Sequence, residues 1–343
     1  MIPIEFWREP GRSAPGLTRS RHRRVVCGEH LGPHEYNNGL VTFQSKGVVL
    51  EKNALVYTCR GGFIDLAHVR DNADLTLFLA TRIARDLPGG SAFDLPEDGA
   101  RRRVVVRPLP PELVLKLGRT ETAVLIAAYL AFRLSVWHEF ITWYGAESVP
   151  GFSERVSAFS PEDLYSNVVG IRLAMGIVRA NLARTRDGYN HAVDAWIAAG
   201  LRRLGAVQHD AAKAAMARVD GVWWDSRKTV RDFALVRRRH VAIRPPIAPW
   251  LAPDACPGIA AHPLDLPERV GDLELAGLAT IAFSVEDKLL RDFPLPVAVE
   301  RPLTIADYPA LEAAVRRDGA MELGPGFDRP EPQPAVARGV PIL

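Results

Sequence analysis

A carboxylate and an imidazole stand three residues apart in the segment YTCRGGFIDLAHVRDNADLT, which covers residues 57–76. On a helix, side chains at this spacing share one face, so Asp65 and His68 point the same way. The pair matches half of the helical metal sites that combine a carboxylate with a histidine. The alternative is that both belong to the solvent face of an ordinary amphipathic helix.

Two further aspartates, Asp71 and Asp74, continue the three-residue interval. A helix has 3.6 residues per turn, so each step of three turns the direction by about 60°. Asp71 therefore follows the stripe only approximately, and Asp74 leaves it. We expect both to face solvent, Arg70 or the helix rim rather than a shared site.

A second candidate pair lies in the segment SVWHEFITWYG, after about fifteen mostly apolar residues. A titratable pair in such surroundings is costly unless it is paired or binds a ligand. His138 and Glu139 match the first half of the zinc-peptidase motif H-E-x-x-H, but Thr142 replaces the second histidine. We expect His138 to reach Asp65 and His68 from a neighbouring helix, and Glu139 to serve as a ligand or general base. A single buried histidine with one hydrogen bond is the alternative.

The segment FSPEDLYSNVVG adds polar residues to a third helix. The start of this helix is predicted by three features: Ser160 as N-cap, proline at the first helical position, and two acids in the first turn. That role alone explains Glu162 and Asp163. Asn167 lies among valine, isoleucine and leucine, where a buried amide needs partners. We expect it to orient the histidine–glutamate pair, and Asn167 or Tyr165 to orient a reacting carbonyl or phosphoryl group.

Cys59 offers a competing chemistry. It ends a strand just before a glycine turn into a helix, and a helix N-terminus lowers the pKa of a thiol. A thiol hydrolase or acyltransferase also needs a base. His68 is too far along the same helix, roughly 12–14 Å away, so His138 would have to serve. A small buried cysteine without reactivity is the alternative.

The composition is that of an ordinary globular protein, with 343 residues, 48% hydrophobic and 24% charged. A net charge of +3 does not indicate nucleic acid or an anionic membrane as a partner. The most apolar run, residues 123–137, is about 15 residues long and contains Arg133. It is too short for a bilayer span, so no transmembrane segment is expected.

The cysteines and the N-terminus both favour the cytoplasm. Cys27, Cys59 and Cys256 have no C-x-x-C spacing and cannot all pair, which is typical of a reduced protein. The first residues lack the basic and then apolar pattern of a signal peptide.

The hydrophobic periods predict an α+β fold with a mainly α-helical core and a small antiparallel sheet. Helical periods run over residues 63–87 and 121–144, and short strands are expected within residues 40–58 and 101–107. We divide the chain into four parts. They are an irregular N-terminal arm (1–38), a main helical domain with the small sheet and the site (39–245), a C-terminal strand and helix extension that packs on it (246–325), and an extended or disordered tail (326–343).

Three segments together carry a resemblance. With YTCRGGFIDLAHVR, HEFITWY and SPEDLYSNVVG, the chain resembles a bacterial family known only as a domain of unknown function, over roughly residues 25–245. The resemblance implies no established activity. It does imply that relatives include exported or lipid-anchored proteins, whereas this chain shows no such leader.

The residues favour a hydrolase with a site between two helices and one divalent metal such as zinc. The expected ligands are Asp65, His68, His138 and Glu139. Glu139 would activate water, and the substrate, small or polymeric, is not specified by the sequence. The alternatives are a thiol enzyme that uses Cys59 and a non-enzymatic protein with a buried polar network.

Overall fold

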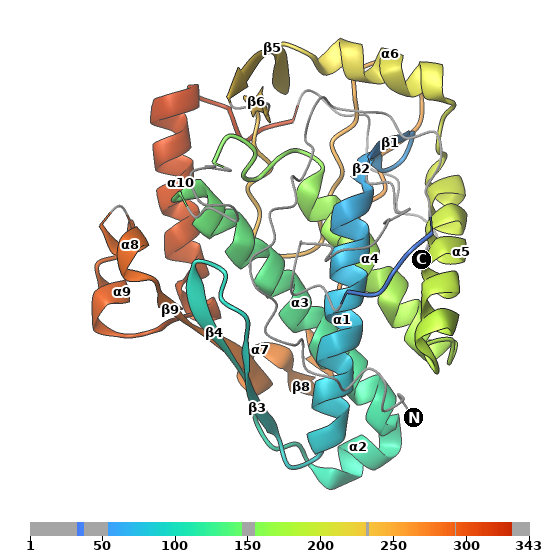
Figure 1. Ribbon diagram of the computed structural model, residues 1–343, viewed down its shortest axis with the longest axis vertical. Coiled ribbons are helices and arrows are strands. Elements are labelled where there is room, and N and C mark those ends of the chain that lie inside the picture. Colours follow the sequence, from blue (N-terminus) through green and yellow to red (C-terminus); the bar gives the residue numbers. More distant parts are fainter. Residues whose placement is uncertain (1–32, 38–53, 146–154, 231–232, 292, 331–343) are drawn as a thin grey trace.

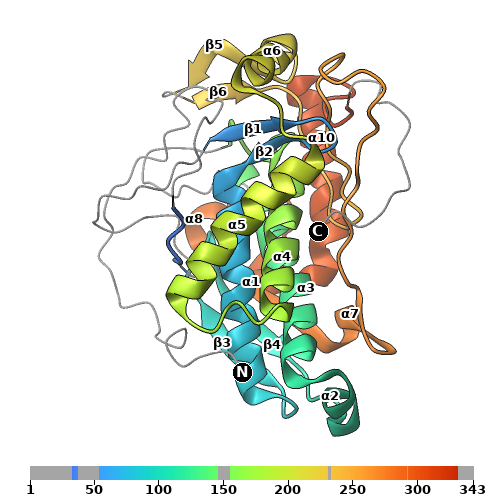
Figure 2. The same cartoon turned by 90° about the vertical axis from the view of Figure 1, so that its right-hand side faces the viewer.

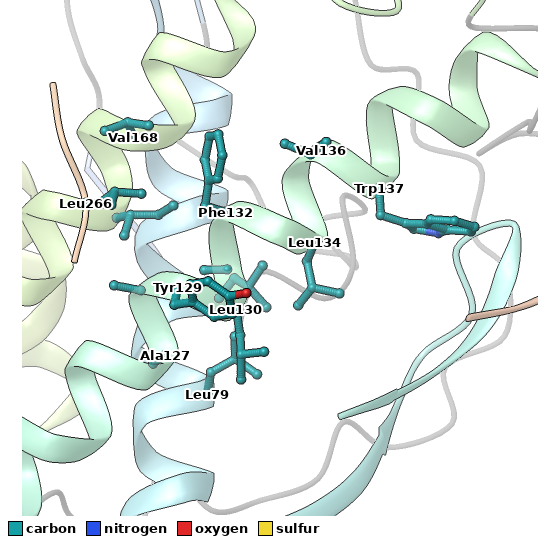
Figure 3. Close-up of a cluster of buried hydrophobic side chains, with 14 of the residues drawn as sticks. Leu79, Ala127, Tyr129, Leu130, Phe132, Leu134, Val136, Trp137, Val168 and Leu266 are labelled. Carbon is teal, nitrogen blue, oxygen red and sulfur yellow. The ribbon is translucent and has the colours of Figure 1, made fainter. Parts of the chain in front are cut away.

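The core is built around three helices that pack against one another, as Figures 1 and 2 show. They are α1 (Leu66–Asp86), α3 (Arg119–Trp143) and α4 (Asp163–Arg179), and α5 (Arg186–Leu204) covers α4. The computed structural model describes residues 33–37, 54–145, 155–230, 233–291 and 293–330. Figure 3 shows the apolar side chains that fill the space between the three core helices and the sheet.

Shorter helices surround this core. They are α2 (Pro111–Leu117), α6 (His209–Val219), α7 (Leu275–Leu278), α8 (Asp287–Leu290), α9 (Val297–Glu300) and α10 (Tyr308–Leu323), with a 3-10 turn at Ile305–Asp307. Of these, α10 packs along α3. Tyr308, at the start of α10, donates a hydrogen bond to the carbonyl oxygen of Arg133 in α3 at 2.7 Å.

All strand pairs in the described part of the chain are antiparallel, and they form small sheets. The largest sheet has the order β10-β9-β4-β3. Its strands are β3 (Ser91–Leu95), β4 (Ala100–Val106), β9 (Ala279–Val285) and β10 (Leu303–Thr304). The other pairs are β1 (Leu55–Thr58) with β2 (Gly62–Asp65), β5 (Trp224–Val230) with β6 (Phe233–Val236), and β7 (Arg269–Val270) with β8 (Leu273–Glu274). The predicted α+β fold with a helical core is confirmed.

The sheet joins segments that lie far apart in the sequence. β9 pairs with β4 from Ala100↔Val285 to Val106↔Ala279. Trp137 of α3 stacks on Phe283 of β9 with ring centroids 4.0 Å apart, which fixes the sheet against the helical core. The C-terminal segment therefore completes the sheet that the earlier strands begin. Residues 40–50, where further strands are expected, lie outside the described residues.

α3 has the length and composition of a membrane span, but 89% of its most apolar stretch is buried inside the protein. Its neighbours α1 and α4 cover it on two sides. It is therefore a core helix, consistent with the expectation that residues 123–137 do not span a bilayer.

Cys59 and Cys256 form a disulfide, with Cα atoms 5.4 Å apart and a sequence separation of 197. The prediction of reduced cysteines is therefore wrong for this pair. The bond ties the turn between β1 and β2 to the segment after β6. Two backbone contacts support the same junction: His262 N donates to Arg60 O at 2.9 Å, and Ala252 N donates to the Tyr57 hydroxyl at 3.1 Å.

Residues 33–37 lie across α1 and α5 as an extended strap. His34 Nε2 lies 2.9 Å from Asp74 Oδ1, Asn37 N donates to Asp74 Oδ2 at 2.7 Å, and the Tyr189 hydroxyl donates to Asp74 Oδ1 at 2.9 Å. Asp74 is completely buried. The expectation that Asp74 faces solvent, Arg70 or the helix rim is therefore wrong, because the strap covers it.

Candidate metal centre

Asp65 stands where β2 ends and α1 begins. β2 extends through Asp65 because it pairs with β1 in the register Leu55↔Asp65, so the helix starts later than its apolar period predicts. The Asp65 carboxylate caps α1: its Oδ1 accepts from Ala67 N at 2.7 Å and from His68 N at 3.4 Å. This capping fixes the carboxylate beside the first turn of α1, where His68 lies.

The first turn of α4 brings a second aspartate to the same place. α4 begins at Asp163 rather than at Pro161. Ser160 N donates to Asp163 Oδ2 at 3.1 Å, and the Ser160 hydroxyl donates to Glu162 Oε1 at 2.9 Å. Asp163 thus has a role beyond starting the helix, because its Oδ1 lies 3.5 Å from Nε2 of His68 in α1.

Asp65, His68 and Asp163 form a group whose ligand atoms all lie within 4.8 Å of one another. His68 Nε2 is 3.5 Å from Asp163 Oδ1. The His68 side chain is 24% exposed and that of Asp163 is 9% exposed. His68 is therefore the most exposed member of the group, and the two aspartates are buried.

The hydrogen bonds of Asn167 determine which nitrogen of His68 is free. Asn72 Nδ2 donates to the carbonyl oxygen of His68 at 3.0 Å and to Asn167 Oδ1 at 2.7 Å. Asn167 Oδ1 is thereby identified as an acceptor, and His68 Nδ1, 2.9 Å from it, must carry a hydrogen. Neutral His68 then has its lone pair on Nε2, the atom that faces Asp163. This is the arrangement that orients a metal-binding histidine.

The charges around His68 are unbalanced. Burial disfavours a charged imidazole, but Asp163, Asp65 and Glu139 raise the pKa of His68 to about 10. Burial and the Asp65 charge raise the pKa of Glu162 to about 7. Burial, with Glu139 and Glu162, also raises the pKa of Asp163 well above its ordinary value. The group thus carries more negative charge than the protein itself neutralises, and it attracts a proton or a cation.

Glu139 lies near this group but serves another partner. It is 2% exposed, and its Oε2 accepts a hydrogen bond from the backbone nitrogen of Phe159 at 2.5 Å. Phe159 has a φ of 56°, which a bulky residue adopts only when its surroundings enforce it. Glu139 therefore stabilises the loop before α4, and the structure does not place it among the three grouped ligand atoms.

His138 points away from His68. Adjacent helical residues diverge by about 100°, so when Glu139 faces α1 and α4, His138 faces the sheet. There His138 Nδ1 lies 3.2 Å from Asp98 Oδ1, in the turn between β3 and β4, and Arg102 is 3.1 Å from the other oxygen of Asp98. The structure thus does not bring His138 to Asp65 and His68 as expected.

This ion pair makes a prediction for acid stability. Burial alone would raise the pKa of Asp98, but His138 and Arg102 lower it to about 2. Because the folded pKa lies below the unfolded value of about 3.9, the stabilisation is present above pH 4 and is lost as the pH falls toward 2. Asp98→Asn should lower the unfolding free energy by about 2 kcal/mol at pH 7, and by about half as much at pH 3.

Urea denaturation at both pH values measures the difference. Asp94→Asn is the matched control, because Asp94 also pairs with an arginine of β4 but is 71% exposed, and it should change little at either pH. An equal loss for Asp98→Asn at pH 7 and pH 3 would contradict the role of its charge.

Two other residues expected at the site lie elsewhere. The Tyr165 hydroxyl donates to the carbonyl oxygen of His262 at 2.8 Å, so Tyr165 holds the segment after β6. Cys59 is oxidised to a disulfide and offers no thiolate. The hypothesis of a Cys59 nucleophile is therefore contradicted by this structure. Asn167 does orient a histidine, but the histidine is His68 rather than His138.

The interpretation of the sequence missed Asp163 as a member of the group. Its place at a helix start is a sufficient explanation for an acid, so no second role was assigned to it. One signal was available: Asp163 precedes Asn167 by four residues, so both lie on one face of α4.

No curated protein and no solved structure matches the chain with significant similarity. One family does match, over residues 20–253, which contain the β1–β2 hairpin, the three core helices and every residue of the group just described. The chain therefore belongs to the family described as Protein of unknown function (DUF4056).

Proposed function

We propose that this protein is a metal-dependent hydrolase that binds one divalent cation, zinc first among them, where α1 and α4 begin. The ligands are Asp65, His68 and Asp163. The observation that carries the proposal is their geometry: the ligand atoms lie within 4.8 Å of one another, and the contact of His68 Nδ1 with Asn167 leaves Nε2 to face Asp163, where a cation would replace its proton. A carboxylate and imidazole set of this kind suits zinc and also manganese or iron.

The charge balance supports a cation at this position. Four carboxylates interact within the group, and the nearby positive charges come from His68 and Arg239. The carboxylates are those of Asp65, Glu139, Glu162 and Asp163. Buried like charges are unfavourable unless they are offset. A bound divalent cation would offset them, which explains why four acids are kept together.

The chemistry follows from the number of protein ligands. A divalent cation with three protein ligands keeps a position for water, lowers the pKa of that water and polarises a bound carbonyl or phosphoryl oxygen. His68 is the most exposed of the three side chains, so we expect a substrate to approach on its side. Asn167 holds that ring in place, and Glu139 fixes the loop that carries Ser160.

The disulfide bears on the compartment in which such an enzyme works. Stable disulfides persist in oxidising compartments and are rare in the cytoplasm. The bond between Cys59 and Cys256 therefore favours export over the cytoplasmic location that the sequence suggests. Cell fractionation tests this: full-length protein found only in the cytoplasm, with both thiols free to alkylation, would contradict export.

Metal analysis of protein purified without a histidine tag tests the metal site. We expect about one equivalent of divalent metal in the wild type and a loss of it in His68→Ala and Asp163→Asn. His191→Ala is the matched control, because His191 also lies three residues from an aspartate, Asp194, on α5 but is exposed, and this variant should retain the metal. His138→Ala should also retain it, because His138 pairs with Asp98.

Hydrolysis is tested with the metal-loaded protein on generic carboxylic and phosphoric esters. Activity that is lost with a chelator, restored by metal and absent in Asp163→Asn supports the proposal. No metal in the wild type, even after supplementation with zinc and manganese, would overturn it. In that case the same residues form a buried structural network, and His68→Ala should simply lower the stability.

A further inference from the structure

Ser160 contacts two acids at once. Its backbone nitrogen donates to Asp163 Oδ2 at 3.1 Å, and its hydroxyl donates to Glu162 Oε1 at 2.9 Å. Each carboxylate thus has one oxygen occupied by Ser160. The second oxygen of Asp163, Oδ1, is the atom that faces His68 Nε2. Ser160 therefore determines how both carboxylates are turned.

The second oxygen of Glu162 is the unusual one. Glu162 Oε2 is buried from solvent and has no hydrogen-bond partner among the described residues. A buried carboxylate oxygen without a donor costs several kcal/mol, and native proteins rarely leave one in that state. Ser160 contacts the carboxylates of both Glu162 and Asp163, so Glu162 lies beside the group, although it is not one of the three residues whose ligand atoms lie within 4.8 Å of one another. The missing partner of Glu162 Oε2 is therefore to be sought in a ligand of that group.

We infer that Glu162 is the fourth protein ligand of the divalent cation, through Oε2, and that Ser160 is the residue that positions Glu162 and Asp163 for it. This inference rests on the proposed metal site. The resulting set of three carboxylates and one imidazole offers three oxygen ligands and one nitrogen ligand. Four protein ligands fill a tetrahedral zinc site, so the water that hydrolysis needs requires a zinc ion that expands to five ligands or a cation with more positions, such as manganese.

The loop that carries Ser160 is held in place by other parts of the protein. Arg239 donates to the carbonyl oxygen of Ala158 at 2.6 Å, and His240 N donates to the carbonyl oxygen of Phe159 at 2.7 Å. Together with the bond from Phe159 N to Glu139, these contacts fix the backbone on both sides of the strained residue. Ser160 is thus positioned before any cation binds, which reduces the ordering cost of binding.

Calorimetric titration of the full chain with zinc chloride, and separately with manganese chloride, tests the inference. Glu162→Gln should weaken binding by about 100-fold and Ser160→Ala by about 10-fold. Ser160→Thr, which keeps the hydroxyl, should restore most of the affinity. Glu112→Gln is the matched control, because Glu112 also follows a proline at a helix start, and it should bind like the wild type.

Thermal unfolding with and without metal separates a ligand from a merely structural residue. We expect Glu162→Gln to unfold without metal at the wild-type temperature or above, because it removes an unpaired buried oxygen. The stabilisation that metal adds should be largely lost. If the wild type binds metal and Glu162→Gln binds it with the same affinity, this inference is overturned and the proposed metal site stays intact. Wild-type protein that binds no metal would overturn both.

Discussion

Asn167→Leu is expected to weaken divalent-cation binding by about 10- to 100-fold, because the partner that orients a metal-binding histidine typically contributes that much. Leucine offers no acceptor to His68 Nδ1, so the imidazole can rotate and can place its hydrogen on Nε2 instead. The substitution also leaves Asn72 Nδ2 with one bond fewer. Calorimetric titration with zinc or manganese measures the loss.

Asn167→Asp is the informative companion. An aspartate at this position still accepts from His68 Nδ1 and from Asn72, and its charge increases the basicity of the imidazole. The affinity should therefore stay near the wild-type value or rise, although the residue becomes acidic within an acidic group. If the leucine and aspartate variants lose affinity equally, Asn167 does not act by orienting His68.

Gly170→Ala should lower the free energy of unfolding by about 3 kcal/mol. In an open helix interior this change would stabilise, by up to about 1 kcal/mol. Here a Cβ at Gly170 would lie 2.1 Å from the carbonyl oxygen of Val69, so α1 and α4 would have to separate. Because Val69 follows His68 and Gly170 lies one turn after Asn167, the cation affinity should fall as well.

Urea denaturation measures the stability, and Gly277→Ala provides the matched control. Gly277 also lies in a helix, α7, but a Cβ there would meet nothing within 4 Å. We expect a change of no more than about 0.5 kcal/mol for this variant. If Gly170→Ala is as stable as Gly277→Ala, the close approach of α1 and α4 is not required for the fold.

The local patterns of the sequence predicted the core helices and two of the three members of the group. The apolar period of α1 and α3 is strong because these helices are buried, and the pair Asp65–His68 could be recognised from its spacing. The position of Asn167 among apolar residues also indicated correctly that it needs partners. These are features that a single helix expresses in its own sequence.

The errors concern contacts between distant segments. Asp74 meets His34, which lies 40 residues earlier in a segment without a hydrophobic period. His138 could be directed toward either α1 or the sheet, and the rotation of α3 that decides this depends on packing with β9. The pairing of Cys59 with Cys256 depends on how a chain segment of 197 residues folds back. Spacing along one element contains no information about such contacts.

The bond between Cys59 and Cys256 also has a consequence for producing the protein. The family match ends at residue 253, just before Cys256, and β9 begins later still. A recombinant fragment cut at that boundary would leave Cys59 without its partner and would remove the strand that pairs along β4. During synthesis, Cys256 follows Cys59 by 197 residues. The disulfide can therefore form only after most of the chain has been made. Expression of the full-length gene with export to an oxidising host compartment is therefore the suitable route.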